Sequence, residues 1–382
     1  MGKYIIVTGG QFANKGAQAM TYIAADEIAK RWPNCKMLMY YNSSKQFNKD
    51  AYKFGFVSDQ GHFLLHTRSY RSVLRDTEAI IDISGYALGS AWSERGNVFF
   101  VKNRLVDAKH YGIPVYLMSQ SFGPFAYRGK LKRVVMFLLK RYLPYARIIM
   151  AREECGEKEL KNTFSLSNVV LTPDLVLQNT GIDLSNVFTE NHTVNCINLE
   201  GNKKVAIIPN KNNARYMSNE ELLKLYHDII EKLKSLGYTI FLVYHSEDDV
   251  EICKRIFESN ISDGVKLLDK ELDCLEFEKT VDQFEFVIAS RYHSVVHAYR
   301  GHVPAIVLGC ADKYRELMKS VQQDQYFFDL RNRIDERFLL DTVTTMSRCV
   351  GENSETIATQ VSDIQKNNMF DMIKLKSELH SC

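Results

Sequence analysis

Long apolar runs are missing from this sequence of 382 residues, and no stretch approaches the roughly 18 to 20 uninterrupted apolar residues that a membrane-spanning helix needs. The apolar run at residues 4–7 is too short for a signal peptide, so we expect a buried strand there and a cytoplasmic protein. The eight cysteines form no CxxC pair, which argues against both a zinc site and a redox motif. We therefore predict free thiols, no metal site and no redox cofactor.

Other absences narrow the class of protein further. The sequence has neither a G-x-G-x-x-G fingerprint nor a P-loop, so binding of a dinucleotide or of ATP is only weakly indicated. It has no recognisable nucleic-acid-binding motif, and we expect no nucleic acid partner. Internal repeats and low-complexity tracts are also missing. With 382 residues, the chain is too long for one ordinary core and about right for two.

Charged residues are nearly balanced overall but unevenly distributed. Residues 1–180 hold 25 Lys and Arg against 14 Asp and Glu, whereas the remainder holds 24 against 32. A basic half followed by an acidic half indicates domains that face different partners. The basic half suits an anionic acceptor or a membrane surface.

Short apolar runs alternate with helical patterns on both sides of a polar central stretch. In the first half we expect strands at 4–8, 36–41, 79–83, 115–119 and 148–151, and helices at 15–31, 99–110 and 131–142. In the second half we expect strands at 204–208, 239–244, 265–268, 286–289 and 305–308, and helices at 219–236, 248–257, 274–281 and 292–300. This alternation predicts mostly parallel sheets covered by helices. The predicted fold class is α/β, with two facing Rossmann-like domains.

The predicted domain boundaries follow composition. We predict an N-terminal domain at 1–180, a linker rich in Asn, Thr, Ser and Gly at 181–203, a C-terminal domain at 204–335 and a polar helical segment at 336–382. In such sheets ligands gather beyond the carboxyl ends of the strands. Functional motifs are therefore expected directly after strands, where most of the polar motifs of this sequence lie.

A glycine-rich motif, Gly9-Gly10-Gln11-Phe12-Ala13-Asn14-Lys15-Gly16-Ala17, follows the first expected strand and opens the first helix. Glycines allow a sharp turn and close approach to a ligand, and the free N–H groups of a helix N-terminus bind anions or hydroxyls. Asn14 and Lys15 are therefore candidates for binding a sugar. A plain glycine-rich turn explains the same composition about equally well.

The expected strand at 79–83 leads into Asp82-Ile83-Ser84-Gly85-Tyr86. A carboxylate at a strand end can accept a proton from a hydroxyl if its geometry and pKa suit, so Asp82 is a candidate base. Capping of the loop is the commoner role for an isolated Asp. Gly85, Tyr86 and Gln120, the last directly after the 115–119 strand, are candidates for contacting a sugar.

Two loops of the second half carry candidate ligands for an anion. Lys211 and Arg215 follow the 204–208 strand, and two cations there suit a carboxylate or a phosphate. His245 follows the 239–244 strand, where it is either a site residue or a bystander. Exposed loop cations are usually only solvated, so these residues carry little weight alone.

The strongest motif is Ser290-Arg291-Tyr292-His293, directly after the apolar strand at 286–289. Ser290 stands where an N-cap belongs, and Arg291 and His293 fall in the first helical turn. The positive end of the helix dipole disfavours cations unless an anion is bound there. The motif therefore predicts an anion site, with His293 as an acid–base group that titrates near neutral pH.

In order and spacing, these motifs resemble those of the polysaccharide pyruvyl transferase family over most of residues 1–330. The matching segments are Asn14-Lys15-Gly16-Ala17-Gln18-Ala19-Met20, Asp82-x-x-Gly85, Gln120-Ser121-Phe122-Gly123-Pro124, Ala151-Arg152-Glu153, Thr172-Pro173-Asp174 and Ser290-Arg291-Tyr292-His293. The resemblance implies a GT-B-like pair of facing domains. It also implies transfer of pyruvate from phosphoenolpyruvate to sugar hydroxyls, generally as a cyclic ketal.

The resemblance also assigns roles on the donor side. Arg291 and His293 match the Arg-x-His that holds phosphoenolpyruvate, and Ser290 and His245 are further candidates. The family often has another Arg near the first strand of the second domain, where this sequence has Lys211 and, just beyond it, Arg215. The sequence leaves open which of the two contacts the donor.

The implied chemistry needs a proton donor, cations and a base. His293 is the expected donor of a proton to the methylene carbon of phosphoenolpyruvate, and Asp82 is the expected base for the sugar hydroxyl. The implied acceptor is a sugar of a bacterial-type surface polysaccharide or its lipid-linked precursor, and no cofactor is expected besides the donor substrate. Two alternatives remain open: a GT-B nucleotide-sugar glycosyltransferase, and a non-catalytic binding protein on the same fold.

Residues 127–147 form a strongly basic segment around an apolar centre, Val134-Val135-Met136-Phe137-Leu138-Leu139. A basic amphipathic helix can lie on an anionic membrane, which would place the protein peripherally at the inner face of the plasma membrane, beside lipid-linked acceptors. An ordinary packed helix with a charged outer face is the alternative.

Overall fold

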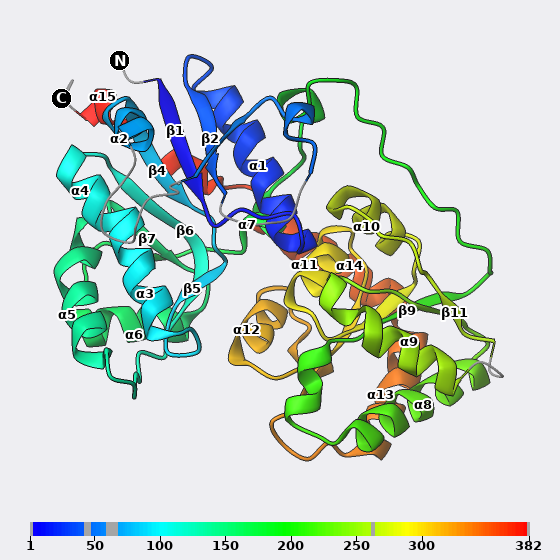
Figure 1. The fold of residues 1–382 in the computed structure, drawn as a ribbon. Helices are drawn as coiled ribbons and strands as arrows, with labels where there is room; N and C mark the ends of the chain where they lie inside the picture. The colour runs from blue at the N-terminus through cyan, green and yellow to red at the C-terminus, as the bar shows by residue number, and fades with distance from the viewer. Residues whose placement is uncertain (1–2, 42–46, 59–67, 261–263, 380–382) are drawn as a thin grey trace.

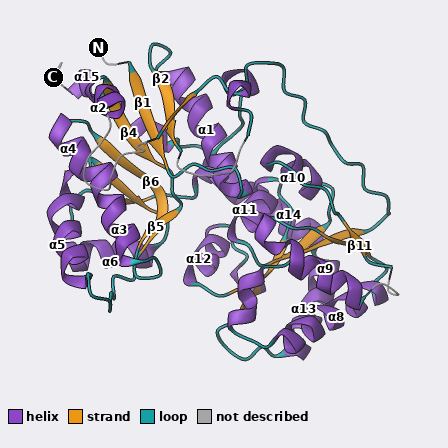
Figure 2. Ribbon diagram, viewed as in Figure 1, coloured by secondary structure: helices purple, strands orange, loops and turns teal. Residues whose placement is uncertain are grey.

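The computed structural model describes residues 3–41, 47–58, 68–260 and 264–379. Two parallel sheets, each packed between helices, lie in two domains joined by a long connection (Figures 1 and 2). The predicted α/β class is confirmed. Strands buried on both faces are typical of parallel sheets, and this explains why the sequence shows continuous apolar runs.

The N-terminal sheet has the strand order β3-β2-β1-β4-β6-β7-β8, with β5 paired to the end of β6. Its strands are β1 (Tyr4–Thr8), β2 (Lys36–Tyr40), β3 (Gly55–Val57), β4 (Thr77–Asp82), β5 (Tyr86–Leu88), β6 (Val115–Phe122), β7 (Ile148–Ala151) and β8 (Val169–Leu171). The helices of this domain are α1 (Lys15–Arg31), α2 (Arg68–Arg75), α3 (Glu94–Val101), α4 (Asp107–Tyr111), α5 (Lys132–Tyr142), α6 (Glu154–Phe164) and α7 (Leu175–Gln178).

The C-terminal sheet has the order β11-β10-β9-β12-β13-β14. Its strands are β9 (Lys204–Ile208), β10 (Thr239–Leu242), β11 (Lys266–Leu267), β12 (Phe286–Ala289), β13 (Ala305–Gly309) and β14 (Phe327–Asp329). The helices of this domain are α8 (Asn219–Ser235), α9 (Val250–Ser259), α10 (Cys274–Val281), α11 (Tyr292–Arg300), α12 (Asp312–Ser320), α13 (Glu336–Arg348) and α14 (Val350–Ile364). The last helix, α15 (Lys376–Leu379), packs on β4 of the N-terminal sheet.

The helix expected at 99–110 is interrupted. Helix α3 begins earlier, at Glu94, where the Ser93 side chain caps it. A π-turn at Lys102–Val106 then separates α3 from α4. Such turns insert a residue and rotate the side chains that follow. Here the turn carries Arg104, whose guanidinium lies over the Phe100 ring and forms an ion pair with the Asp82 carboxylate.

The segment expected as one C-terminal helical unit, 336–382, is divided between the domains. Helix α13 packs on α8, and α14 packs on both α11 and α7. The chain then returns to the N-terminal domain, where the Tyr116 hydroxyl donates to the carbonyl of Lys374 at 2.7 Å and Asp371 pairs with Arg31. The two ends of the chain consequently lie close together in Figure 1.

The segment expected as a linker, 181–203, also differs in part from the expectation. Its first residues belong to the N-terminal domain: the carbonyl of Val187 accepts from Lys53 N at 2.9 Å, and Thr189 N donates to the carbonyl of Ala51 at 2.9 Å. The rest of the segment has no regular secondary structure and runs along one side of the molecule to β9 (Figure 1).

Candidate functional site

A cavity of about 630 Å³ lies between the domains, beyond the carboxyl ends of β1, β4, β9, β12 and β13. Both domains contribute to its wall, as expected when two parallel sheets face each other. The lining residues are Gln11, Asn14, Ala17, Met20, Ser84, Gly85, Tyr86, Ala91, Trp92, Arg152, Asn210, Asn212, Arg215, Tyr216, His245, Arg291, Tyr292, His293, Cys310, Ala311, Lys313 and Tyr314. No Asp or Glu is among these described residues, so the wall carries cations without carboxylates.

Arg291 lies at the N-terminus of α11 and is held from behind by Asp249. Its Nε donates to Asp249 Oδ2 at 2.7 Å and its Nη2 donates to Oδ1 at 2.6 Å, while the Asp249 side chain is fully buried. A bidentate pair of this kind fixes the plane of the guanidinium. Nη1 takes no part in this pair, and Asp249 is a site residue that the sequence did not reveal.

His293 lies in the first turn of α11, and its side chain is 14% exposed. Its Nε2 lies 3.7 Å from Asp174 Oδ2 and has no hydrogen-bond partner among the described residues. Burial lowers the pKa of His293 to about 3, because the charge of Arg152 adds to the desolvation cost and Asp174 only partly offsets it. His293 is therefore neutral in the ligand-free protein.

His245 also reaches the cavity, and both of its ring nitrogens lack a partner among the described residues. Burial, together with the cation of Lys15, holds the pKa of His245 well below its usual value. Lys15 itself lies outside the cavity wall. Its Nζ donates to the carbonyl of His245 at 3.1 Å, so it joins the two domains behind the site.

The buried Arg152, which we did not single out as a site residue, organises the opposite wall. Its Nη1 donates to Asp174 Oδ2 at 2.8 Å, its Nε donates to Glu153 Oε1 at 3.0 Å, and its Nη2 donates to the Gly85 carbonyl at 3.2 Å. The guanidinium carbon lies 4.0 Å from the centre of the Tyr292 ring. Arg152 thus connects the β4 and β7 loops to α11. The Ala151-Arg152-Glu153 segment was the available signal, since it places adjacent charges at the end of a buried strand.

Lys313, in the first turn of α12, was also missed. Its Nζ lies between 5.4 and 5.9 Å from the ring centres of Tyr86, Tyr292 and Tyr314. Burial, and after it the charge of Arg152, lowers the pKa of Lys313 to about 8. The sequence around Lys313 contains no signal of a site. Lys313 reaches the cavity because β13 ends there and α12 begins directly after it.

The predicted acceptor residues separate into two groups. Asn14, Gly85 and Tyr86 line the cavity. The side chain of Asn14 caps α1 by accepting from Gly16 N at 3.0 Å, and the Tyr86 hydroxyl donates to the Gly123 carbonyl at 3.0 Å. Lys15 and Gln120 lie outside the wall.

Asp82, the expected base, is fully buried and does not line the cavity. Its carboxylate accepts from Thr8 Oγ1 at 2.6 Å and from Gln120 Nε2 at 3.1 Å, and it forms an ion pair with Arg104. These contacts fix the ends of β1, β4 and β6 relative to one another. Asp82 and Gln120 therefore stabilise the edge of the sheet. The position of Asp82 does not support the catalytic role that we expected for it.

Two of the predicted donor residues also lie elsewhere. Ser290 is buried, its carbonyl accepts from Asn210 Nδ2 at 3.0 Å, and the N-cap position of α11 belongs to Arg291. Lys211 pairs at the surface with Asp248 at 2.8 Å and is not part of the wall. Arg215 does line the cavity, so the structure favours it over Lys211.

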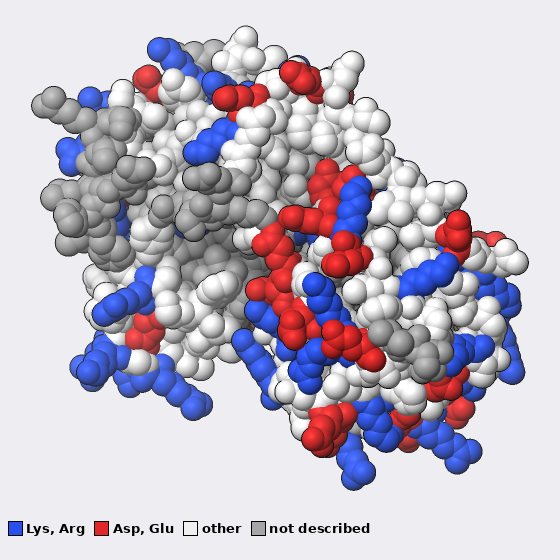
Figure 3. Space-filling view, turned by 45° about the vertical axis from the view of Figure 1, so that its right-hand side comes forward, with Lys and Arg blue, Asp and Glu red and all other residues white. Residues whose placement is uncertain are grey.

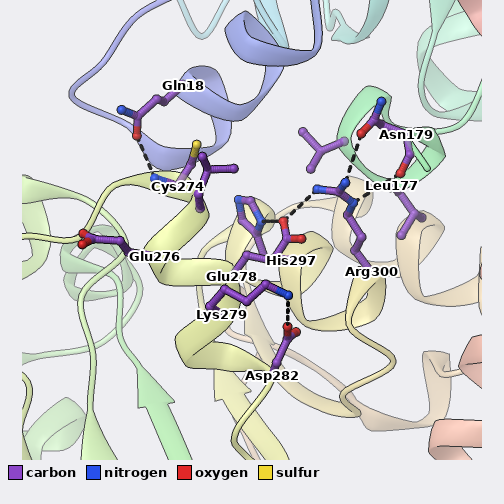
Figure 4. Close-up of polar contacts among 12 residues, drawn as sticks. Gln18, Leu177, Asn179, Cys274, Glu276, Glu278, Lys279, Asp282, His297 and Arg300 are labelled. Atoms are coloured by element: carbon purple, nitrogen blue, oxygen red, sulfur yellow. Dashed lines mark hydrogen bonds and ion pairs between the residues drawn. The ribbon is translucent and has the colours of Figure 1, made fainter. Parts of the chain in front are cut away.

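Polar contacts behind the cavity hold the two domains together (Figure 4). The backbone N of Cys274 in α10 donates to Gln18 Oε1 in α1 at 2.8 Å. Arg300 of α11 donates from Nη2 to Asn179 Oδ1 at 3.0 Å and from Nη1 to Glu278 Oε2 at 2.7 Å. Since α11 carries Arg291 and His293, these contacts also position the site.

Two general findings apply to the described ranges only. Within them, no group of three or more His, Cys, Asp or Glu side chains is arranged to hold a metal ion. No helix there has the length and apolar character needed to cross a bilayer.

Two facing Rossmann-like domains with a cavity between them define a protein of the GT-B fold, and solved structures agree. Staphylococcus aureus MnaA, solved with UDP, aligns with a TM-score of 0.57 at 9% identity over 97% of this chain and 94% of its own. Anabaena HepE, solved with UDP and glucose, aligns at 0.53 and 11% identity over 95% and 97%. Phytolacca americana UGT2 aligns at 0.53 and 13% identity over 99% of both chains. Identities this low establish the fold alone.

The sequence itself identifies the family. The model of the polysaccharide pyruvyl transferase family matches residues 14–312, which contain every residue of the cavity wall except Gln11 and the C-terminal residues Lys313 and Tyr314. The chain belongs to the polysaccharide pyruvyl transferase family, as the resemblance of its motifs predicted. Comparison with curated protein sequences found no significant match.

Proposed function

We propose that the protein transfers the pyruvyl group of phosphoenolpyruvate to a sugar and forms a cyclic pyruvate ketal. The observation that carries this proposal is the cavity wall itself, which contains Arg291, Lys313 and Arg215 together with His293, whose Nε2 has no hydrogen-bond partner among the described residues. Phosphoenolpyruvate carries a phosphate and a carboxylate on the same carbon and therefore requires several cations in one small space. Membership of the family supports the same conclusion.

The donor is expected to bind against the C-terminal domain. Arg291 offers its free edge to one anionic group, and Lys313, a compact charge with a flexible stem, suits the other. Arg152 uses its donors on protein groups, so its part is to hold Tyr292 and Asp174 around His293. Binding of an anion beside His293 raises the pKa of the imidazole, because the new negative charge stabilises its protonated form.

Protonated His293 then gives its proton to the methylene carbon of the donor, and the adjacent carbon becomes electrophilic. A sugar hydroxyl forms a C–O bond to that carbon and loses its proton. The product is an intermediate in which this carbon is tetrahedral and still carries the phosphate. A second hydroxyl of the same sugar replaces the phosphate at this carbon and closes the ketal ring. Phosphate leaves with the proton of that hydroxyl. The overall change is one phosphoenolpyruvate and one diol to one ketal and one phosphate.

The acceptor is expected against the N-terminal domain, where Asn14, Gln11 and Tyr86 line the wall. With Asp82 engaged elsewhere and no described carboxylate in the wall, the neutral and unpartnered His245 is the group we assign to receive the hydroxyl proton. The acceptor is a sugar of a surface polysaccharide or of its lipid-linked precursor.

The direct test is incubation of the protein with phosphoenolpyruvate and a panel of glycosides with two free neighbouring hydroxyls. The expected result is phosphate release together with a product whose mass is increased by one pyruvate less one water. A melting temperature raised by phosphoenolpyruvate and not by UDP-sugars supports the donor assignment.

A nucleotide-sugar glycosyltransferase is the second candidate, because solved structures of the same fold contain UDP. Stabilisation by a UDP-sugar, with sugar transfer and without phosphate release from phosphoenolpyruvate, would replace our proposal with that function. Binding of the donor without turnover across the panel would favour a non-catalytic binding protein.

Donor affinity is expected to depend on pH through Lys313. Its pKa is lowered to about 8 in the free protein, so the amine is protonated below this pH and loses its charge above it. The dissociation constant for phosphoenolpyruvate should therefore rise more steeply with pH above about pH 8 than below it, because loss of the Lys313 charge adds up to about tenfold per pH unit. Isothermal titration across this range measures the effect.

The matched control is Lys313→Arg, which keeps its charge throughout the range. The additional steepness above pH 8 should disappear in this variant. If it persists, another group is responsible, and Lys15, whose pKa is also lowered to about 8 by burial, would be the first to examine.

A further inference from the structure

The segment that contains α5 is basic and has no acidic residue over a long stretch of sequence. Between Gly123 and Ala151 the sequence has no Asp or Glu. The cations of this stretch are Arg128, Lys130, Lys132, Arg133, Lys140, Arg141 and Arg147. Figure 3 shows Lys and Arg side chains gathered at the lower left of the molecule, the end of the N-terminal domain where Figure 1 places α3, α5 and α6.

The outer face of α5 is apolar at its centre. Phe137 is 66% exposed and Val134 is 46% exposed, although both belong to a helix of a folded domain. Arg133 precedes Phe137 by four residues, and Lys140 and Arg141 follow it by three and four, so all three cations lie on the same face of the helix. We call Arg133, Val134, Phe137, Lys140 and Arg141 the α5 face.

The composition of the α5 face is not what a solvated helix requires. Val135 and Leu139 of α5 are buried, and the half-buried Met136, Leu138 and Tyr142 pack beside them, so the helix is attached to its domain by its other face. Cations in the first turn, Lys132 and Arg133, oppose the helix dipole, and an anionic surface removes that cost. An exposed aromatic side chain among cations is typical of helices that lie in the interface of an anionic membrane.

Neighbouring charges do not neutralise the α5 face. Helix α3 packs against α5 and contributes Glu94, whose carboxylate accepts from Gly129 N at 2.7 Å and from Leu131 N at 2.8 Å. Lys109 of α4 lies over the rings of Tyr142 and Tyr145 and adds another cation. The carboxylate of Glu94 thus binds the backbone of the loop before α5.

A groove beside the cavity is formed in part by the loop that precedes α5. It has a volume of about 820 Å³. Its lining consists of Ser90, residues 92–95 and residues 126–131, and the last of these form the loop that leads into α5. Trp92, which is 53% exposed, lines both the groove and the cavity. A chain of sugars that leaves the cavity along Trp92 would therefore pass Arg95, Arg128 and Lys130 toward the α5 face.

We propose that the α5 face docks on an anionic lipid bilayer, with Phe137 and Val134 in the interface and the flanking cations on lipid phosphates. This inference does not depend on the reaction proposed above, because it concerns adsorption of the whole protein to a surface. If the reaction is as proposed, the docked orientation opens the groove toward acceptors anchored in the same bilayer.

The test is co-sedimentation of the full chain with phosphatidylcholine vesicles that contain or lack phosphatidylglycerol, at low and high salt. We expect binding only to the anionic vesicles and weaker binding at high salt. Reversing two charges, Arg133→Glu with Arg141→Glu, should weaken binding at least ~25-fold, since each cation near an anionic bilayer contributes roughly fivefold. Phe137→Ser should weaken it by about tenfold.

The C-terminal domain supplies matched controls. Phe338 is 59% exposed on α13, and Phe338→Ser should leave binding unchanged. The pair Lys254→Glu and Arg348→Glu makes the same change of net charge at exposed positions of α9 and α13 and should have little effect. Melting temperatures within a few degrees of the parent protein show that the variants are folded.

Three results would overturn the proposal. One is the lack of binding to anionic vesicles at low salt. Another is equal loss of binding in the α5 and control charge variants, which would indicate a non-specific effect of net charge. The third is binding of soluble RNA through the same residues with affinity equal to that for vesicles, which would assign the surface to a polyanion.

Discussion

We expect His293→Gln to lower the turnover number by about 10²- to 10⁴-fold while changing the dissociation constant of phosphoenolpyruvate by less than about tenfold. Glutamine keeps a polar group near the position of the imidazole Nε2 but cannot become a cation that gives up a proton. The cations of Arg291 and Lys313 remain, so the donor still binds. Steady-state kinetics of phosphate release, combined with titration of the donor, separate the two quantities.

Proton uptake provides a second measurement of the same residue. Because burial keeps His293 neutral in the free protein, donor binding should take up a proton at this site. Calorimetric titrations in buffers with different ionisation enthalpies report the uptake. We expect less uptake in His293→Gln, since protons bound by the phosphate of the donor contribute equally to both proteins.

A substitution at Gly16 tests whether the position of the His293 ring matters when its imidazole is unchanged. A Cβ atom at Gly16 would lie 2.1 Å from His293 Cγ, so the ring packs directly on this backbone and Gly16→Ala must displace it. We expect Gly16→Ala to lower turnover although the imidazole is intact. Turnover of His293→Gln within about threefold of the parent protein would remove His293 from the mechanism.

Much of the fold could be predicted from the sequence, since parallel strands that are buried on both sides appear as short apolar runs. The prediction was least accurate for elements too short to show a period. Strand β5 has three residues and α7 has four, and both belong to the wall or support of the site. The prediction of one helix at 99–110 was wrong for another reason. The π-turn at Lys102–Val106 shifts the helical period of the apolar residues without changing the composition.

The site shows where sequence reasoning stops. Parallel strands end at one edge of a sheet, so motifs that follow them gather there, and Asn14, Gly85, Arg291 and His293 all line the cavity. The same argument placed Asp82 at this edge. Asp82 pairs with Thr8 in the register of β1 and β4, and Arg104 covers it from the π-turn, which only the tertiary structure reveals.

The sequence also does not show which carboxylate pairs with which cation. Glu247, Asp248 and Asp249 are adjacent carboxylates, and nothing in their order shows that Asp249 is the buried partner of Arg291 while Asp248 pairs with Lys211 at the surface. Of the two cations that the sequence left open, Arg215 lines the cavity and Lys211 does not, and Lys313 joins it there. These assignments depend on side-chain direction and not on spacing.

The second large effect is expected at Arg152. Replacement by Met, which has a similar length, should lower the free energy of unfolding of the N-terminal domain by about 3 to 5 kcal/mol. The side chains of Arg152 and Asp174 are 4% and 0% exposed, so the change leaves the carboxylates of Asp174 and Glu153 buried without their cation. Urea unfolding followed by intrinsic fluorescence measures the loss, with its midpoint assigned to this domain.

An exposed ion pair of the same domain is the matched control. Lys158 and Glu154 lie 2.8 Å apart on α6 but are 68% and 56% exposed, so Lys158→Met should leave the free energy of unfolding nearly unchanged. A loss below about 1 kcal/mol in Arg152→Met would contradict a stabilising role for the buried network.

The pH dependence of the loss follows from the same charges. Without Arg152, a buried carboxylate is expected to have a pKa above its value in the unfolded chain, so that protonation favours the folded state. The stability difference between Arg152→Met and the parent protein should therefore shrink as the pH falls toward about 4, where unfolded carboxylates titrate.

A double variant isolates the contribution of the pair. Asp174 caps α7 by accepting from Val176 N at 2.9 Å, and asparagine can keep this bond while removing the charge. Arg152→Met combined with Asp174→Asn should therefore be more stable than Arg152→Met alone. Because Nη1 of Arg152 and Nε2 of His293 both face Asp174, the double variant should recover stability without recovering turnover, which separates the folding role of this carboxylate from its part in positioning His293.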